Sequence, residues 1–152
     1  DISNDSCIDC PSLQLLQKSL DRTVLTQPNN GLRISSPEEE CCLGPACWLW
    51  DYLRRSGAAG YLLPLSGGAD SSSVCAIVSA MCHLVVEAAP KDPQVAADVR
   101  RICHQSEDWL PSTPQELANH VLHTIFMGTE NSSEKTTSRA KRLGQAIGTY
   151  RS

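Results

Sequence analysis

A short apolar run, Tyr61-Leu62-Leu63-Pro64-Leu65, leads directly into the loop Ser66-Gly67-Gly68-Ala69-Asp70-Ser71-Ser72. The length of the run is typical of a buried strand. Pro64 has no amide proton to give to a sheet, so it should lie near the end of that strand. A helix from about Ser71 to Ala88 should follow, because apolar residues recur there at helical spacing: Val74, Ile77, Val78, Met81 and Val85. The stretch therefore predicts a strand, a glycine-rich loop and a helix in succession.

A second helix is predicted upstream of the strand. Ser36-Pro37-Glu38-Glu39 combines a capping serine, a proline at the first helical position and a capping-box glutamate. The helix should run towards Ser56, with Gly57 just beyond its end. Gly44-Pro45 inside it predicts a kink or a break. Its apolar face is expected to be Trp48, Leu49, Tyr52 and Leu53.

Helices and one more strand are predicted downstream. Asp92-Pro93 starts a helix that carries Val95, Val99, Ile102 and Cys103, and Thr113-Pro114-Gln115-Glu116 repeats the capping signature. Residues 120–128 are interpreted as a strand, and Asn131 or Ser132 should cap a last helix that ends at Ile147, before Gly148. Strands separated by helices imply an α/β fold with a parallel sheet. Only two strands are visible, and a third would be expected after Gly148, but the chain stops at Ser152. We therefore expect a partial Rossmann-like sheet with flanking helices, truncated at its C-terminal side.

Composition narrows the class of protein. The chain has 152 residues, which suggests one domain. Its net charge is −4, so it lacks the surplus of basic residues that is typical of nucleic-acid-binding proteins. The longest purely apolar run is far short of the ~18 residues of a membrane span, and the N-terminus has no secretory signal pattern. Residues 1–35 are interpreted as a tail or inter-domain linker, and residues 36–152 as a partial domain. The eight cysteines are therefore expected to be reduced thiols of a cytoplasmic protein.

Several other candidate sites give weaker signals. Cys7 and Cys10 form a lone C-x-x-C pair, which is a weak indication of zinc and more typical of two thiols in a flexible tail. His120 and His123 lie three apart about a strand, so they should point to opposite faces. Trp48, Trp50 and Tyr52 are expected to serve packing or an inter-domain contact. A basic group is interpreted as a solvated helix face, with an anionic ligand as the alternative: Lys135, Arg139, Lys141 and Arg142.

The glycine-rich loop has the composition of a phosphate site. Gly67 and Gly68 allow backbone amides to approach an anion closely, and the positive end of the next helix points at the same place. Asp70 suits a Mg²⁺ ion that bridges phosphate oxygens. No lysine follows as in a Walker A loop, the G-x-G-x-x-G fingerprint is absent, and Leu63 replaces the first glycine of a nucleophile elbow. A tight turn with a polar cap remains the alternative.

The loop Ser66-Gly67-Gly68-x-Asp70-Ser71-Ser72 resembles the PP-loop of the ATP pyrophosphatases. Two flanking segments are similar, more narrowly, to the synthetase domain of eukaryotic glutamine-dependent NAD synthetases. They are residues 38–65, which contain Leu43-Gly44-Pro45-Ala46-Cys47-Trp48, and residues 124–148, which contain Phe126-Met127-Gly128-Thr129-Glu130-Asn131-Ser132-Ser133. The similarity runs over most of residues 37–150.

This resemblance implies a reaction and a set of ligands. ATP would adenylate the carboxylate of deamido-NAD with release of pyrophosphate, and ammonia from glutamine, supplied by an amidase domain, would displace AMP to give NAD. Ser66, Gly67, Gly68, Ser71 and Ser72 would bind the pyrophosphate portion of ATP, and Asp70 would bind Mg²⁺. Met127, Gly128 and Thr129 would help to form the adenine pocket. No catalytic residue is assigned.

The resemblance also leaves alternatives. The family forms homo-oligomers, so a contact surface is expected. The later strands of the family lie beyond Ser152, and the chain alone is therefore expected to be inactive. One alternative is a non-catalytic truncated isoform that acts as an interaction or regulatory fragment. Another is a different PP-loop amidotransferase, such as a GMP synthetase, against which the flanking segments argue.

Overall fold

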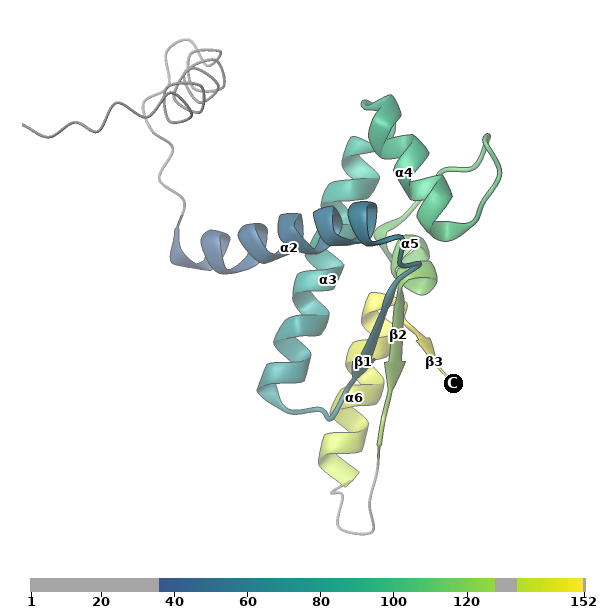
Figure 1. Ribbon diagram of the computed structural model, residues 1–152. Helices are drawn as coiled ribbons and strands as arrows, with labels where there is room; N and C mark the ends of the chain where they lie inside the picture. The colour runs from purple at the N-terminus through teal and green to yellow at the C-terminus, as the bar shows by residue number, and fades with distance from the viewer. Residues whose placement is uncertain (1–35, 128–133, 152) are drawn as a thin grey trace, which may run out of the picture. The chain divides into compact units, whose positions relative to one another are not determined.

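The computed structural model describes residues 36–127 and 134–151, and within them a parallel sheet lies against helices (Figure 1). The strands are β1 (Tyr61–Pro64), β2 (Leu122–Ile125) and β3 (Tyr150–Arg151), in the order β1-β2-β3. Tyr61 pairs with Leu122, and the pairing runs in parallel to the end of both strands. The predicted α/β class with a parallel sheet is confirmed. The short strand β3 pairs with β2 after Gly148, which is where the sequence leads us to expect a third strand.

Helix α2 (Pro37–Ser56) begins and ends as its sequence predicts. The Glu39 amide donates to Ser36 Oγ at 3.2 Å, and the Ser36 amide donates to Glu39 Oε2 at 3.0 Å. Gly57 ends the helix with φ +73°. A break at Gly44-Pro45 does not occur, since the helix continues through Pro45. The carbonyl that Pro45 leaves without a helical donor belongs to Cys41, which is exposed, so water can hydrate it.

The buried face of α2 differs from the predicted one. Leu53 and Ala46 are fully buried, but Trp48 is 64% exposed and Tyr52 is 50% exposed. The two aromatic rings stack on each other at the surface, with centroids 5.7 Å apart. Helical spacing alone could not show where the neighbouring helix lies, and that position decides which arc of α2 is covered.

Helix α3 (Ala69–Ala88) is the central helix of the core and contacts α2, α4, α5 and α6. Its buried residues are Cys75, Val78, Met81, Cys82 and Val85. Val74 was predicted on this face but is 43% exposed. By length and composition alone α3 could cross a membrane. Its contacts with four other helices are those of a core helix.

Three further helices complete the described part of the chain: α4 (Pro93–Cys103), α5 (Pro114–Val121) and α6 (Glu134–Ile147). Asp92 and Thr113 cap α4 and α5 as predicted. The strand predicted over 120–128 begins later, because His120 and Val121 still belong to α5, where Val121 is buried beside Leu117 and Ala118. The cap predicted for α6 at Asn131 or Ser132 lies outside the described residues.

A buried carboxylate joins α2 to α4. Asp98 of α4 is 8% exposed and lies 3.2 Å from Arg101 Nη2 and 3.7 Å from Arg54 Nη1 of α2. Gln94 Nε2 donates at 3.3 Å to Asp98 Oδ2, the carboxylate oxygen that also faces Arg54. Arg101 Nη2 also donates to the Arg54 carbonyl. The pair of helices is therefore fixed by charge as well as by apolar packing.

The cysteines of the described residues are free thiols. Three of them lie in the core, and burial raises the pKa of Cys75 and of Cys103 to about 11 and that of Cys82 to about 12. They therefore stay protonated and act as small apolar side chains, as the sequence predicts for Cys75 and Cys82. Cys7 and Cys10 lie outside the described residues.

Candidate functional site

The glycine-rich loop lies at the carboxyl edge of the sheet, between β1 and α3 (Figure 1). Pro64 is the last residue of β1 and pairs with Ile125 of β2. The Leu65 amide then donates to the Ile125 carbonyl at 2.8 Å, so the loop leaves the sheet at a fixed point. Open parallel sheets bind their ligands beyond this edge.

Gly67 is required by both its backbone angle and its surroundings. Its φ is +79°, which residues with a Cβ rarely adopt. A Cβ placed on it would lie 2.2 Å from the carbonyl oxygen of Thr136 in α6. Gly68 differs, with φ −82° and only Ser66 Oγ near such a Cβ, at 3.3 Å. Gly67 therefore sets the turn and lets the loop lie directly against α6.

The N-terminus of α3 faces this loop without a side-chain cap. Gly68 occupies the N-cap position, and within residues 36–127 and 134–151 no side chain accepts a capping hydrogen bond from the first amides of the helix. Such amides and the helix dipole favour an anion. The Ser66 and Ser71 hydroxyls lie 3.0 Å apart, and Gly68 N donates to Ser66 Oγ at 3.3 Å. Both hydroxyls thus lie beside the uncapped amides.

Two predicted residues of the loop differ in what they can offer. The Ser72 amide already donates to the Gly68 carbonyl at 3.2 Å, which leaves its hydroxyl for a ligand. Asp70 is exposed in the first turn of α3. Across residues 36–127 and 134–151, no three carboxylate, imidazole or thiol side chains group together as a metal site would require. Asp70 could therefore hold Mg²⁺ only together with phosphate or water oxygens, which is a common Mg²⁺ arrangement.

The end of β2 lies beside the loop, as the parallel register requires. Ile125 is paired with Pro64, and Phe126 and Met127 follow it towards the same edge. Met127 is 69% exposed, so its side chain is accessible to a ligand. Gly128 and Thr129, predicted with Met127 for an adenine pocket, lie outside the described residues.

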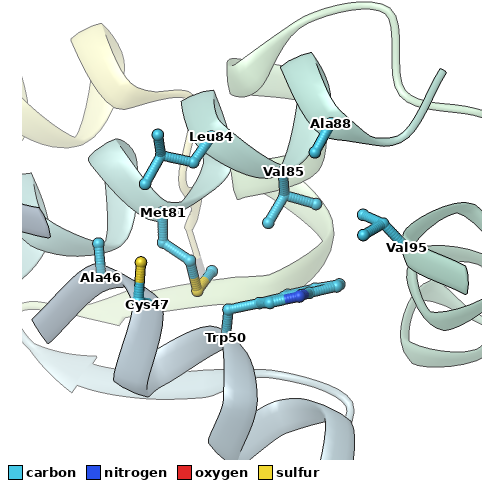
Figure 2. A pocket seen from close by; sticks show the side chains of 8 residues that line it. All are labelled: Ala46, Cys47, Trp50, Met81, Leu84, Val85, Ala88 and Val95. Atoms are coloured by element: carbon cyan, nitrogen blue, oxygen red, sulfur yellow. The ribbon is translucent and has the colours of Figure 1, made fainter. Parts of the chain in front are cut away.

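The predicted histidines and Trp50 lie away from this site. His120 lies on α5 with its ring 5.2 Å from that of Trp109, edge to face, whereas His123 lies on β2, so they do not flank one strand. Trp50 lines an apolar hollow of about 180 Å³ between α2, α3 and α4, shown in Figure 2. The side chains around it are almost entirely apolar, which does not suit a nucleotide: Ala46, Cys47, Trp50, Met81, Leu84, Val85, Ala88 and Val95.

The contact between Gly67 and Thr136 places α6 at the site, which sequence reasoning did not find. No local signal could have shown it, because the two residues are far apart in the chain and meet only in the fold. The basic residues predicted as a solvated face lie on this helix. Lys135, Arg139 and Arg142 line a shallow hollow of about 400 Å³ with Glu134 and Ser138.

Comparison with known proteins gives a consistent set of relatives. The chain is 50% identical over 145 residues to a glutamine-dependent NAD(+) synthetase of Saccharomyces cerevisiae, a match covering 94% of this chain and 20% of the relative. It is 58% identical over 116 residues to one of Arabidopsis thaliana, covering 76% of this chain and 16% of the relative. The chain thus spans about a fifth of the length of these relatives. No protein-family model matches it.

A solved structure agrees with the sequence relatives. The crystal structure of a glutamine-dependent NAD(+) synthetase from Cytophaga hutchinsonii superposes with a TM-score of 0.64 at 27% identity. The match covers 77% of this chain and 21% of the solved one. Sequence and fold therefore point to the same group of proteins.

Proposed function

We propose that this chain, which is homologous to a segment of the glutamine-dependent NAD(+) synthetases, forms the ATP-binding part of an enzyme that amidates deamido-NAD to NAD. In this reaction ATP adenylates the carboxylate of deamido-NAD, pyrophosphate leaves, and ammonia derived from glutamine displaces AMP. The proposal takes the fold to be of the PP-loop type.

The loop binds the pyrophosphate portion of ATP in this proposal. The uncapped amides of α3 and the hydroxyls of Ser66, Ser71 and Ser72 donate to phosphate oxygens. Gly67 and Gly68 keep side chains out of the space through which the anion approaches. Negative charge grows on the departing pyrophosphate, so donors fixed in place before the reaction stabilise the transition state more than the substrate.

Asp70 is the residue that would hold Mg²⁺. The donor chemistry fits, because Mg²⁺ commonly takes one or two carboxylates and completes its shell with phosphate and water oxygens. When bound, the ion would neutralise part of the charge on the phosphates. Without it, Asp70 would repel the ligand that the loop otherwise attracts.

The other parts of the proposal rest on the family alone. Met127, with Gly128 and Thr129, contacts the adenine ring. Ammonia comes from glutamine through an amidase part of the whole protein, which is a cytoplasmic homo-oligomer. An isolated chain of residues 1–152 binds nucleotide but does not form NAD by itself.

The single observation that carries this proposal is the uncapped N-terminus of α3 behind a glycine-rich loop, at the carboxyl edge of a parallel sheet. A GMP synthetase or a purely structural fragment would be compatible with such a loop. The identity of 50–58% to NAD(+) synthetases over most of the chain favours NAD synthesis.

Calorimetric titration of the purified chain with Mg²⁺ and ATP tests the nucleotide site. We expect saturable binding that Asp70→Asn weakens about tenfold, because the variant loses a charge-assisted contact. Asp108→Asn is the matched control, since it removes the same charge from an exposed residue between α4 and α5. Absence of binding by the folded chain, or equal weakening by both variants, would contradict the site.

A segment exchange tests the reaction. The 145 matching residues of the Saccharomyces cerevisiae relative would be replaced by those of this chain, and NAD formation from deamido-NAD, ATP and ammonia would be measured. We expect the exchanged enzyme to form NAD and its Asp70→Asn variant to lose most of that activity. A soluble exchanged enzyme that binds ATP but forms no NAD would count against the proposed reaction.

A further inference from the structure

The proposed phosphate loop contains no cation. Residues 66–72 carry hydroxyls, glycines and the carboxylate of Asp70, but no lysine or arginine. A pyrophosphate group bears several negative charges, and backbone amides with one Mg²⁺ ion neutralise only part of them. Lysine and arginine side chains commonly supply the remaining positive charge at phosphate sites. The fold should therefore bring cations to this edge of the sheet from elsewhere.

Helix α6 is the element that lies against the loop. A Cβ on Gly67 would be 3.2 Å from Thr136 Cα and 2.2 Å from Thr136 O, so the two backbones touch. Lys135 precedes Thr136 directly, with Cα atoms about 3.8 Å apart. Arg139 is three residues further along the helix, where side chains of the same face lie about 5–6 Å apart. Both side chains therefore start within one helical turn of the loop.

The basic residues of α6 form one stripe. Lys135, Arg139 and Arg142 are spaced i, i+4 and i+7, which puts them on one side of the helix, next to the buried face made by Ala140, Gly144 and Ile147. All three are exposed and line the shallow hollow of about 400 Å³. Within residues 36–127 and 134–151, no ion pair joins any of them to a carboxylate. Glu134 on the rim is the one acidic residue lining this hollow.

We propose that Lys135 and Arg139 complete the phosphate site, binding from α6 the same pyrophosphate portion that the loop and the N-terminus of α3 bind from the other side. This inference rests on the proposed function and adds the residues that supply its positive charge. The planar guanidinium of Arg139 suits two phosphate oxygens at once, and Lys135 supplies a mobile point charge. Arg142 lies six residues beyond Thr136, about 9 Å along the helix axis, and contributes less.

Titration of the full chain with inorganic pyrophosphate and Mg²⁺ tests this inference. Lys135→Gln and Arg139→Gln are each expected to weaken binding about fivefold to tenfold, because each removes a charge-assisted contact. Arg142→Gln should weaken it by less than about threefold, since a distant exposed charge is screened. Lys91→Gln is the matched control: it removes one charge in the turn that follows the far end of α3, where Lys91 pairs with Glu87. Gly67→Ala and Asp70→Asn test the loop in the same assay.

The outcomes separate this inference from the proposed function. Weakening by Lys135→Gln and Arg139→Gln beyond that of Lys91→Gln, together with loss in the loop variants, supports the joint site. Weakening in the loop variants alone overturns the role of α6 and leaves the proposed function intact. Weakening in the α6 variants alone overturns the joint site, because the anion would then bind α6 without the loop. No binding of pyrophosphate by the folded wild-type chain overturns both.

Discussion

Replacement of Gly67 by alanine should destabilise the fold and remove the phosphate site together. The backbone at φ +79° costs an L-residue about 1–2 kcal/mol. The new Cβ would also lie 2.2 Å from Thr136 O, so the loop and α6 must separate, at a cost of about 1–3 kcal/mol as in other overpacked sites. The expected loss is therefore about 2–5 kcal/mol of unfolding free energy. At about 4 °C for each kcal/mol, the melting temperature should fall by roughly 8–20 °C.

Two other glycines separate the conformational cost from the steric one. Gly57 has φ +73° but open space around its Cβ position, so Gly57→Ala should lose only about 1–2 kcal/mol. Gly68 has an ordinary φ of −82°, and Gly68→Ala should change stability by less than about 1 kcal/mol. Thermal unfolding followed by circular dichroism compares the three variants. If Gly67→Ala is no more destabilising than Gly57→Ala, the loop and α6 do not approach each other as closely as the structure shows.

Three more results are expected from the core. In urea titration, Asp98→Ala should lower the unfolding free energy by about 2–3 kcal/mol, because it leaves the Arg54 and Arg101 guanidiniums without their buried carboxylate. The control Asp108→Ala should change it by close to zero. An equally small change for Asp98→Ala would contradict the role of the buried carboxylate. Native-state alkylation at pH 8, mapped by mass spectrometry, should modify the exposed Cys41 and Cys47 and spare the core thiols. Burial raises the pKa of the core thiols, so their contribution to the free energy of unfolding is complete below pH 9. That contribution is lost as the pH rises through about 11 to 12. Unfolding that begins well below pH 9 would show that another group causes it. The core thiols are Cys75, Cys82 and Cys103.

The sequence predicted best what its residues decide locally. Ser36 with Glu39 fixes the start of α2 through two hydrogen bonds within one turn, and Gly57 ends it through its own backbone angle. The glycine-rich loop belongs to the same class, because its conformation depends on Gly67 itself. Such signals need no knowledge of the rest of the fold, and the parallel sheet followed from the order of the elements they delimit.

Predictions failed where packing against a neighbouring element decides which residues are buried or where an element begins. Trp48 and Tyr52 have the right spacing for a buried face, yet α3 covers the arc that carries Ala46 and Leu53. Val121 was assigned to a strand because the residues around it are apolar, but it fills the buried face of α5 and the strand begins one residue later. For Trp48 and Tyr52 the hydrophobic pattern predicted burial on the wrong arc of the helix, and for Val121 it predicted burial correctly but in the wrong element.

The same division runs through the candidate site. The proposed donors to phosphate oxygens all belong to one continuous segment, the loop and the uncapped end of α3, so the sequence motif was enough to predict them. The motif could not predict the source of positive charge, because residues 66–72 contain no lysine or arginine. In our proposal this charge comes from α6, because the fold places Thr136 against Gly67 and because Lys135 and Arg139 lie within one helical turn of Thr136. The glycine that permits this contact thus has two roles: it shapes the anion-binding turn, and it sets how closely the cations of α6 approach it. A side chain at position 67 should reduce both, which is why the stability and the pyrophosphate affinity of Gly67→Ala are expected to fall together.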